Sequence, residues 1–599
     1  MTSGQGLLRR LPFSASTTPF QALAYLLGIS LFSIAFLVFL NSSVSFVITD
    51  LIGVKDGVGD IVGTLGFVDE VVALVACPIW GLISDRLGVR YVAVLGYTVI
   101  GLSLFLFVQA RNVYPQLLLA RIFFAVGATA AATMVTAILP SLTDETDAAA
   151  GRECESSMPR DRSSVALSVD SEATITPERF RNSGDHPPSD EEEPATDSQS
   201  TGKPSALAGY VGLFTGCGAL VALSLFLPLP ARFSHIDGVT LANAVRYSFY
   251  VVGLVAVMVS IFVFFGLRGL RGEEAKGFRM LFGLKRSAAH GPTSSTSSTA
   301  LGNKPLPYRH LLLRALHLGV TDPDITLGYL GGFVARASTV AISLFVPLYV
   351  NTYFIGHGFC RGASPTDPSP ELKKECRQAY VLASVLTGVA QLVGLICAPL
   401  FGYLSSRRGA AERFHWPLVV AAVFGILGYV AFPMLRSPEF KDVKGRGGSP
   451  VVFLLAAFLG VSQIGAIVCS LGSLGKGVLK VEVVNVLVRP DGDQEILVEA
   501  ATAGEDGDAT APLLDNPPPP PRDTVSRVSL KGSVAGVYSW FGGAAILLLT
   551  KLGGYLFDSW STGAPFYLMA MFNGLLLAAC LGIDFARAVR ARRRRLLTL

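Results

Sequence analysis

The chain has 599 residues, of which 51% are hydrophobic and 16% are charged, and its formal net charge is +5. Soluble proteins carry about 25% charged residues, so this composition excludes an ordinary soluble fold and predicts an all-α, polytopic membrane protein. The basic residues stand in short clusters beside apolar runs, which indicates that they set membrane orientation. Nucleic acid is therefore not an expected partner.

Twelve apolar stretches are long enough to cross a hydrocarbon core, which takes roughly 20 residues of helix. A short polar leader over residues 1–20 precedes them. The first six helices are expected at about residues 21–48, 61–83, 91–108, 115–139, 205–227 and 247–267. The second six are expected at about residues 326–354, 379–404, 417–435, 451–474, 532–557 and 565–583.

Polar segments interrupt this series, and each is too poor in apolar residues to fold alone. A central linker over 268–324 divides the chain into an N-terminal six-helix bundle, 21–267, and a C-terminal six-helix bundle, 325–583. Each bundle is expected to hold one disordered insert, at 143–201 and 476–529 respectively.

The two halves carry a repeated stretch. Residues 68–88 read VDEVVALVACPIWGLISDRLG, and residues 389–409 read VAQLVGLICAPLFGYLSSRRG, 321 positions later. Eight positions are identical in the two copies: Val68/Val389, Val72/Val393, Leu74/Leu395, Pro78/Pro399, Gly81/Gly402, Ser84/Ser405, Arg86/Arg407 and Gly88/Gly409. This repeat predicts two pseudo-symmetric halves, an organisation common among secondary transporters.

Membrane orientation follows from helix parity and charge. With twelve crossings, the segments after helices 4, 6 and 10 share one side of the membrane with both termini. That side carries most of the basic loop residues, namely Arg9, Arg10, Arg86, Arg90, Arg407, Arg408, Arg413 and the arginines of the basic tail, 584–599. The positive-inside rule therefore predicts cytosolic termini and linkers, and both the plasma membrane and the vacuolar membrane fit this topology.

The end of the first repeat carries a motif of small and charged residues, Gly81-x-x-x-Asp85-Arg86-x-Gly88-x-Arg90. It resembles the loop 2–3 motif of the major facilitator superfamily, and Gly402, Arg407 and Gly409 form its partial echo. A turn over residues 558–567 is similar to that of many fungal-type members. The resemblance implies a twelve-helix transporter that moves a small organic solute by alternating access, with the motif as a gate.

The gate has a simpler alternative, in which the arginines only set topology. Orientation alone needs no glycines, so the glycine spacing favours a gate. Asp85 is then expected to meet either the N-terminus of a neighbouring helix or an arginine. Because Ser406 stands in its place in the second copy, a latch there should be weaker or made differently.

Four charged residues and one glutamine inside the membrane are the candidates for substrate binding and proton coupling. Burial of a carboxylate at this depth costs ~2.5–3.5 kcal/mol even on a mild scale, so such residues are usually functional. The candidates are Asp69, Glu70, Arg121, Arg336 and Gln391. In the repeat Glu70 aligns with the polar Gln391 and Asp69 with Ala390, which favours Glu70. The alternative is that Arg121 and an acid form a structural ion pair.

The remaining features bear on function class. Cys360 and Cys376 share one external loop and are expected to form a disulfide, with two free thiols as the alternative. No Cys/His spacing indicates a metal site, and no nucleophile and base pair indicates an enzyme. We expect no cofactor. The favoured function is transport by a monomer with a small-molecule substrate, the lipid bilayer and protons as partners; a non-transporting nutrient sensor is the alternative.

Overall fold

The computed structural model describes most of the chain. The described residues are 11–54, 58–144, 196–236, 238–270, 273, 276–281, 308–356, 377–407, 415–440, 447–484 and 523–597. Within them, twelve helices are long and apolar enough to cross a membrane. The predicted all-α membrane fold is therefore confirmed. The expected disulfide cannot be placed, because Cys360 and Cys376 lie outside the described residues.

The N-terminal half holds the first six spans. Span 1 is continuous from α2 to η2, and π-helical turns interrupt it. The elements are α2 (Pro19–Leu23), η1 (Ala24–Leu31), α3 (Phe32–Phe46), η2 (Val47–Ile52), α4 (Val58–Leu87), α5 (Val89–Phe107), η3 (Val113–Leu117), α6 (Leu118–Thr143), α8 (Thr196–Val221), η6 (Ala222–Phe226), α9 (Leu229–Ser234) and α10 (Leu241–Gly266).

The C-terminal half follows two short helices of the central linker, α11 (Phe278–Leu281) and α12 (Tyr308–Thr321). Its elements are α13 (Pro323–Val340), η7 (Ala341–Phe345), α14 (Val346–Gly356), α16 (Arg377–Ser406), α17 (Trp416–Ala431), η8 (Phe432–Met434), α18 (Val451–Leu479), β1 (Val481–Val484), β2 (Asp523–Ser526), η9 (Arg527–Leu530), α19 (Lys531–Leu548), η10 (Leu549–Gly553), α20 (Gly554–Ser559) and α21 (Ala564–Leu597).

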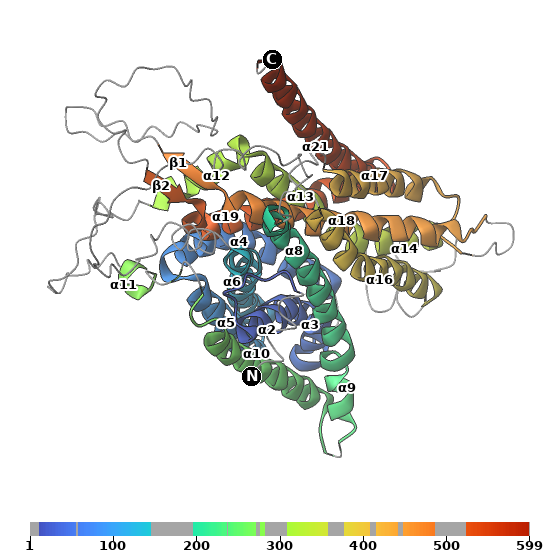
Figure 1. Cartoon of the computed structure of the whole chain (residues 1–599). Coiled ribbons are helices and arrows are strands. Elements are labelled where there is room, and N and C mark those ends of the chain that lie inside the picture. The colour runs from blue at the N-terminus through green and yellow to red at the C-terminus, as the bar shows by residue number, and fades with distance from the viewer. Residues whose placement is uncertain are drawn as a thin grey trace, which may run out of the picture.

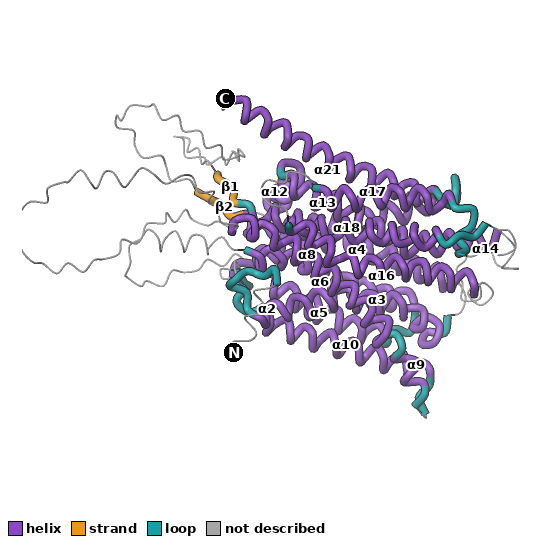
Figure 2. The backbone as a smooth tube through the Cα atoms, turned by 45° about the vertical axis from the view of Figure 1, so that its right-hand side comes forward, coloured by secondary structure: helices purple, strands orange, loops and turns teal. Residues whose placement is uncertain are grey.

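The helices form two bundles that lie side by side (Figure 1). The helices run roughly parallel to one another. α2, α12, β1 and β2 lie at one end of the bundles, and α9 and α14 lie at the other (Figure 2). We call these the linker end and the far end. α4 finishes at the linker end, so the motif around Asp85 lies there.

Buried tyrosines join helices within the N-terminal half. The hydroxyl of Tyr25 donates to the carbonyl of Val135 at 2.6 Å, and the hydroxyl of Tyr97 donates to the carbonyl of Ile29 at 2.9 Å. Both rings are fully buried. Because each hydroxyl has an acceptor, its burial does not carry the penalty of about 1–3 kcal/mol for an unpaired polar group.

Three elements extend what the sequence predicted. α12 occupies part of the central linker, and its inward side chains Leu311, Ala315 and Leu318 recur at helical spacing. α21 continues into the basic tail because no glycine or proline follows Gly582 and arginine is a good helix former. β1 and β2 pair antiparallel, with Val481 opposite Ser526.

Candidate functional site

The two halves meet at the linker end through glycines of α4 and α19. A Cβ atom at Gly81 would lie 2.5 Å from the carbonyl oxygen of Gly532, and one at Gly536 would lie 2.8 Å from the carbonyl oxygen of Cys77. No side chain fits at these distances. The glycine spacing of the motif therefore permits backbone contact between the halves.

Asp85 of α4 caps the N-terminus of α19. Its carboxylate accepts hydrogen bonds from the backbone N–H groups of Gly532 and Ser533, each at 2.7 Å, and from the hydroxyl of Ser533. The N-cap residue of α19 itself, Leu530, has no capping side chain. Asp85 is 5% exposed, so its charge faces the positive end of the helix dipole with little screening by water.

A second carboxylate at the linker end comes from the central linker. Glu273 accepts the backbone N–H of Val89, the first residue of α5, at 2.6 Å. Its other oxygen lies 2.7 Å from the amine of Lys531, the first residue of α19. Lys531 is completely buried and also donates to the hydroxyl of Ser141 at 2.5 Å. The linker therefore ties α5 and α6 of one half to α19 of the other.

The sequence did not predict a contact between Glu273 and Lys531. The one sign of such a contact is that Lys531 stands at the very start of an apolar helix, with no acidic residue nearby in sequence. Its partner Glu273 lies in the central linker, far from Lys531 in sequence. No local sequence pattern could therefore have paired the two residues.

The arginines of the motif have separate partners. The guanidinium of Arg86 lies 3.7 Å from the ring centre of Tyr308 at the start of α12. Arg90 donates from Nε to the carbonyl of Phe264 at 2.8 Å. Arg90 thus binds α5 to α10 within its own half, whereas Arg86 reaches the central linker. Both make specific contacts beyond any effect on topology.

The second copy of the motif contacts α8. A Cβ atom at Gly402 of α16 would lie 2.7 Å from the Cα atom of Gly209. Arg407 lies over the ring of Tyr403 at 4.5 Å, and Gly409 lies outside the described residues. Ser406 stands where Asp85 stands in the first copy and supplies no carboxylate. The contact between α8 and α16 is therefore made by glycines without an acidic cap from this position.

Asp69 and Arg121 form an ion pair within the N-terminal half. Nε of Arg121 lies 2.9 Å from both carboxylate oxygens of Asp69, and Nη2 donates to Asp69 and to the amide oxygen of Asn41. Arg121 is 3% exposed, and its Nη1 is buried without a partner. Asn41, Asp69 and Arg121 thus join span 1, α4 and α6. This is an ion pair of Arg121 with an acid, as in the alternative to a transport role stated from the sequence.

Glu70 and Arg336 are charged residues on helices of different halves. Glu70 lies within electrostatic range of Arg336 on α13 and of Arg121. Within the described part of the chain, neither Glu70 nor Arg336 makes a hydrogen bond or an ion pair. Both side chains are only partly buried. Unlike Asp69, Glu70 therefore keeps its carboxylate available.

The spacing of α4 and α19 changes along their length. At Gly543 of α19, a Cβ atom would lie 3.7 Å from Leu74 and 3.8 Å from Ala73, compared with 2.5 Å at Gly81. The backbones of the two helices therefore touch at the linker end, whereas at Gly543 only side-chain contact remains. Glu70 lies one helical turn beyond Leu74.

Gln391 takes part in a polar chain within the C-terminal half. Its amide donates to Gln463 at 3.4 Å, and Gln463 donates to the hydroxyl of Thr339 at 3.0 Å. Thr339 lies one turn from Arg336 on the same span. Among the described residues, no hydrogen bond joins Gln391 to the four charged candidates.

Lys551 is a further cation near this region. Its side chain is exposed, and its amine lies 4.3 Å from the ring centre of Phe67 on α4.

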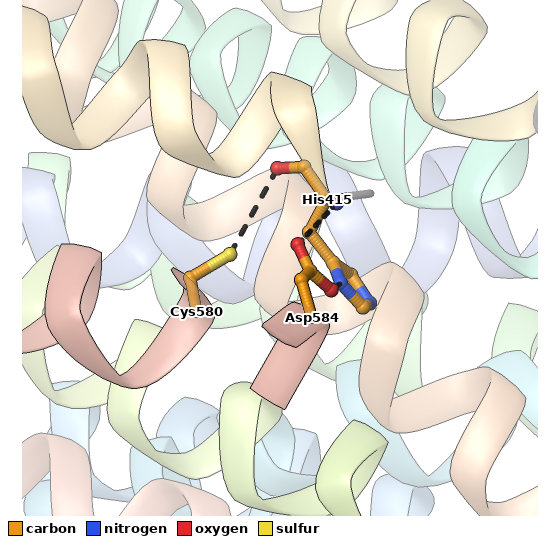
Figure 3. Close-up of side chains that lie close together, drawn as sticks. All are labelled: His415, Cys580 and Asp584. Atoms are coloured by element: carbon orange, nitrogen blue, oxygen red, sulfur yellow. Dashed lines mark hydrogen bonds and ion pairs between the residues drawn. The ribbon is translucent and has the colours of Figure 1, made fainter. Parts of the chain in front are cut away.

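His415, Cys580 and Asp584 form the one group in the described residues with possible metal-ligand geometry (Figure 3). Nδ1 of His415 lies 2.5 Å from Asp584, whose other oxygen accepts the backbone N–H of His415 at 2.7 Å. Ligands that share a zinc ion stand roughly 3.3 Å apart. The guanidinium of Arg587 also lies 3.4 Å from Nε2 of His415. This group is therefore a hydrogen-bonded junction of α17 and α21.

Two six-helix halves in contact at one end, with unpaired charges beyond the contact, define the fold of a secondary transporter. The sequence model of the Major Facilitator Superfamily matches residues 29–151. This match covers part of the N-terminal half, and the twelve-helix fold agrees with the predicted superfamily. The fungal-type assignment stays a prediction.

Solved structures show the same fold. A bacterial homologue of the iron transporter ferroportin, in an outward-facing state, aligns with 94% of this chain and 99% of its own at 13% identity and a TM-score of 0.51. The fucose:proton symporter of E. coli aligns with 94% and 98% of the two chains at 13% identity and a TM-score of 0.47. Such similarities show the fold alone. No curated protein matches the sequence.

Proposed function

We propose that the chain is a secondary active transporter that moves a small organic solute across a membrane by alternating access. The observation that carries this proposal is the contact at the linker end. A single carboxylate, Asp85, accepts the backbone N–H groups of the opposite half. Such a contact can form and break as a unit, as a gate requires.

The proposed state is closed at the linker end. The backbone contact of α4 and α19 at Gly81 and Gly536, which gives way to side-chain contact at Gly543, supports this assignment. Taking the linker end as cytosolic, which the positive-inside rule favours, the structure represents an outward-facing state. Release of Asp85 from α19 would then open the cytosolic side.

We further propose that Glu70 carries the coupled proton. Asp69 is neutralised by Arg121, so protonation there would leave the guanidinium buried and uncompensated. Glu70 has no such partner among the described residues and lies within electrostatic range of Arg336 of the other half. Protonation of Glu70 would remove its attraction to Arg336 and so link the proton to the relative position of the halves.

The test uses the full chain in liposomes that contain a pH-sensitive dye. Solutes added outside are expected to drive proton entry in the native chain. Glu70→Gln should abolish solute-driven proton movement while solute exchange across equal pH persists. The matched Asp69→Asn change should reduce protein yield or stability instead. Solute uptake that does not respond to a pH gradient would refute coupling, and absence of all flux would favour the sensor.

A further inference from the structure

The cations around the proposed site exceed the anions that neutralise them. Asp69 is fully engaged by Arg121. This leaves Glu70 as the acid near Arg336, and the two are not in contact. Among the described residues, Lys551 contacts an aromatic ring and forms no ion pair with a carboxylate. With Glu70 protonated, no described carboxylate pairs with Arg336 or Lys551.

The side chain of Arg336 is held in place, while its guanidinium has no hydrogen-bond or ion-pair partner in the part of the chain that the structure describes. A Cβ atom at Gly542 of α19 would lie 2.8 Å from Cγ of Arg336 and 3.6 Å from its Nε. The aliphatic stem therefore packs on the glycine. Since an unpaired guanidinium is costly at membrane depth, such a residue is expected to have a functional partner.

A second donor points to the same kind of partner. Nη1 of Arg121 is buried and has no acceptor among the described residues. Guanidinium groups present planar pairs of N–H donors that match the two oxygens of a carboxylate. Lys551, exposed in η10 just after the end of α19, would raise the local concentration of anions.

We propose that the transported solute is an organic anion bearing a carboxylate, and that Arg336 binds this carboxylate. The inference rests on the proposed function and adds the class of substrate to it. The carboxylates of Glu70 and of the solute then compete for Arg336. A proton on Glu70 removes its negative charge and so ends this competition. The proton and the anion therefore bind together.

The first test measures the charge preference of the site without knowledge of the solute. Thr339→Cys, one turn from Arg336, is introduced into the full chain with its eight native cysteines replaced. The introduced thiol is reacted with anionic sulfonatoethyl methanethiosulfonate and with cationic trimethylammonioethyl methanethiosulfonate. Relative to a free thiol in solution, the anionic reagent should be favoured about tenfold.

Variants at Arg336 test whether this residue causes the preference for the anionic reagent. Arg336→Gln should remove it, Arg336→Lys should retain it, and the exposed Arg246→Gln on α10 serves as a matched control that should leave it unchanged. Preference for the cationic reagent, a ratio unaffected by Arg336→Gln, or no reaction of the thiol with either reagent would each overturn the proposal.

A second test separates this inference from transport itself. The full chain in dye-loaded liposomes is offered lactate, succinate, choline and mannitol. Proton entry driven by lactate or succinate and lost in Arg336→Gln supports both proposals. An anionic preference without flux of any solute would sustain the site and refute transport. Flux of choline or mannitol that survives Arg336→Gln would sustain transport and refute the anion site.

Discussion

Asp69 and Glu70 are neighbours in sequence, but a rotation of about 100° per residue places them on different sides of α4. Asp69 faces α6 and meets Arg121, whereas Glu70 lies near Arg336 of α13. One acid therefore belongs to the packing of a half, and the other to the boundary between the halves. This division gives each acid a distinct mutational signature.

The ion pair of Asp69 and Arg121 can be tested by stability. Arg121→Gln leaves a buried carboxylate without its partner, which should cost about 3–5 kcal/mol and lower the midpoint of thermal unfolding in detergent. The double change Arg121→Gln with Asp69→Asn should recover part of this loss. A single Arg121→Gln change with native stability would contradict a structural role for the pair.

At the scale of elements, the N-termini of three helices are capped by carboxylates distant in sequence. Asp85 caps α19, Glu273 caps α5 and Asp584 caps α17. α5 and α17 are the third spans of their halves, and their caps come from the end of the sixth span or just after it. The two halves therefore share this device, and of these three carboxylates Asp85 is the one that lies on a helix of one half and caps a helix of the other.

The cap on α19 predicts how the gate responds to mutation. Asp85→Asn removes a charge–dipole attraction of up to about 2 kcal/mol, so the open linker end should become more populated. In a cysteine-free chain, a maleimide should then label Ser84→Cys, which is fully buried in this state, about threefold faster or more.

Asp50→Asn, near the far end of span 1, is the matched control for this labelling and should leave the rate unchanged. Equal rates with and without Asp85→Asn would show that the cap does not hold the gate closed.

The helices and the close glycine contact of the motif could be predicted from sequence because hydrophobic length and glycine spacing are local properties. The sequence also favoured Glu70 over Asp69 through its repeat partner Gln391, yet Gln391 is hydrogen-bonded to Gln463 instead. The contacts of Lys531 with Glu273 and Ser141 depend on packing of segments far apart in sequence. α12 escaped prediction because its apolar positions lie within a basic, polar linker.

At the scale of the whole molecule, both copies of the repeat make close contacts between the halves. The first copy of the repeat contacts α19 and the second contacts α8, as expected for two halves related by pseudo-symmetry. Only the first contact has the capping carboxylate. Opening of the linker end should therefore be governed mainly by α4 and α19.

The central claim is that the two ends open alternately, and distance measurements between spin labels test it most directly. One pair, Arg268→Cys with Ala586→Cys, spans the linker end, and another, Leu241→Cys with Tyr555→Cys, spans the far end; all four sites are exposed. Each pair should report two distances, and Asp85→Asn should lengthen the first while shortening the second. Distances at both ends that stay single and unchanged, or that lengthen together, would contradict alternating access.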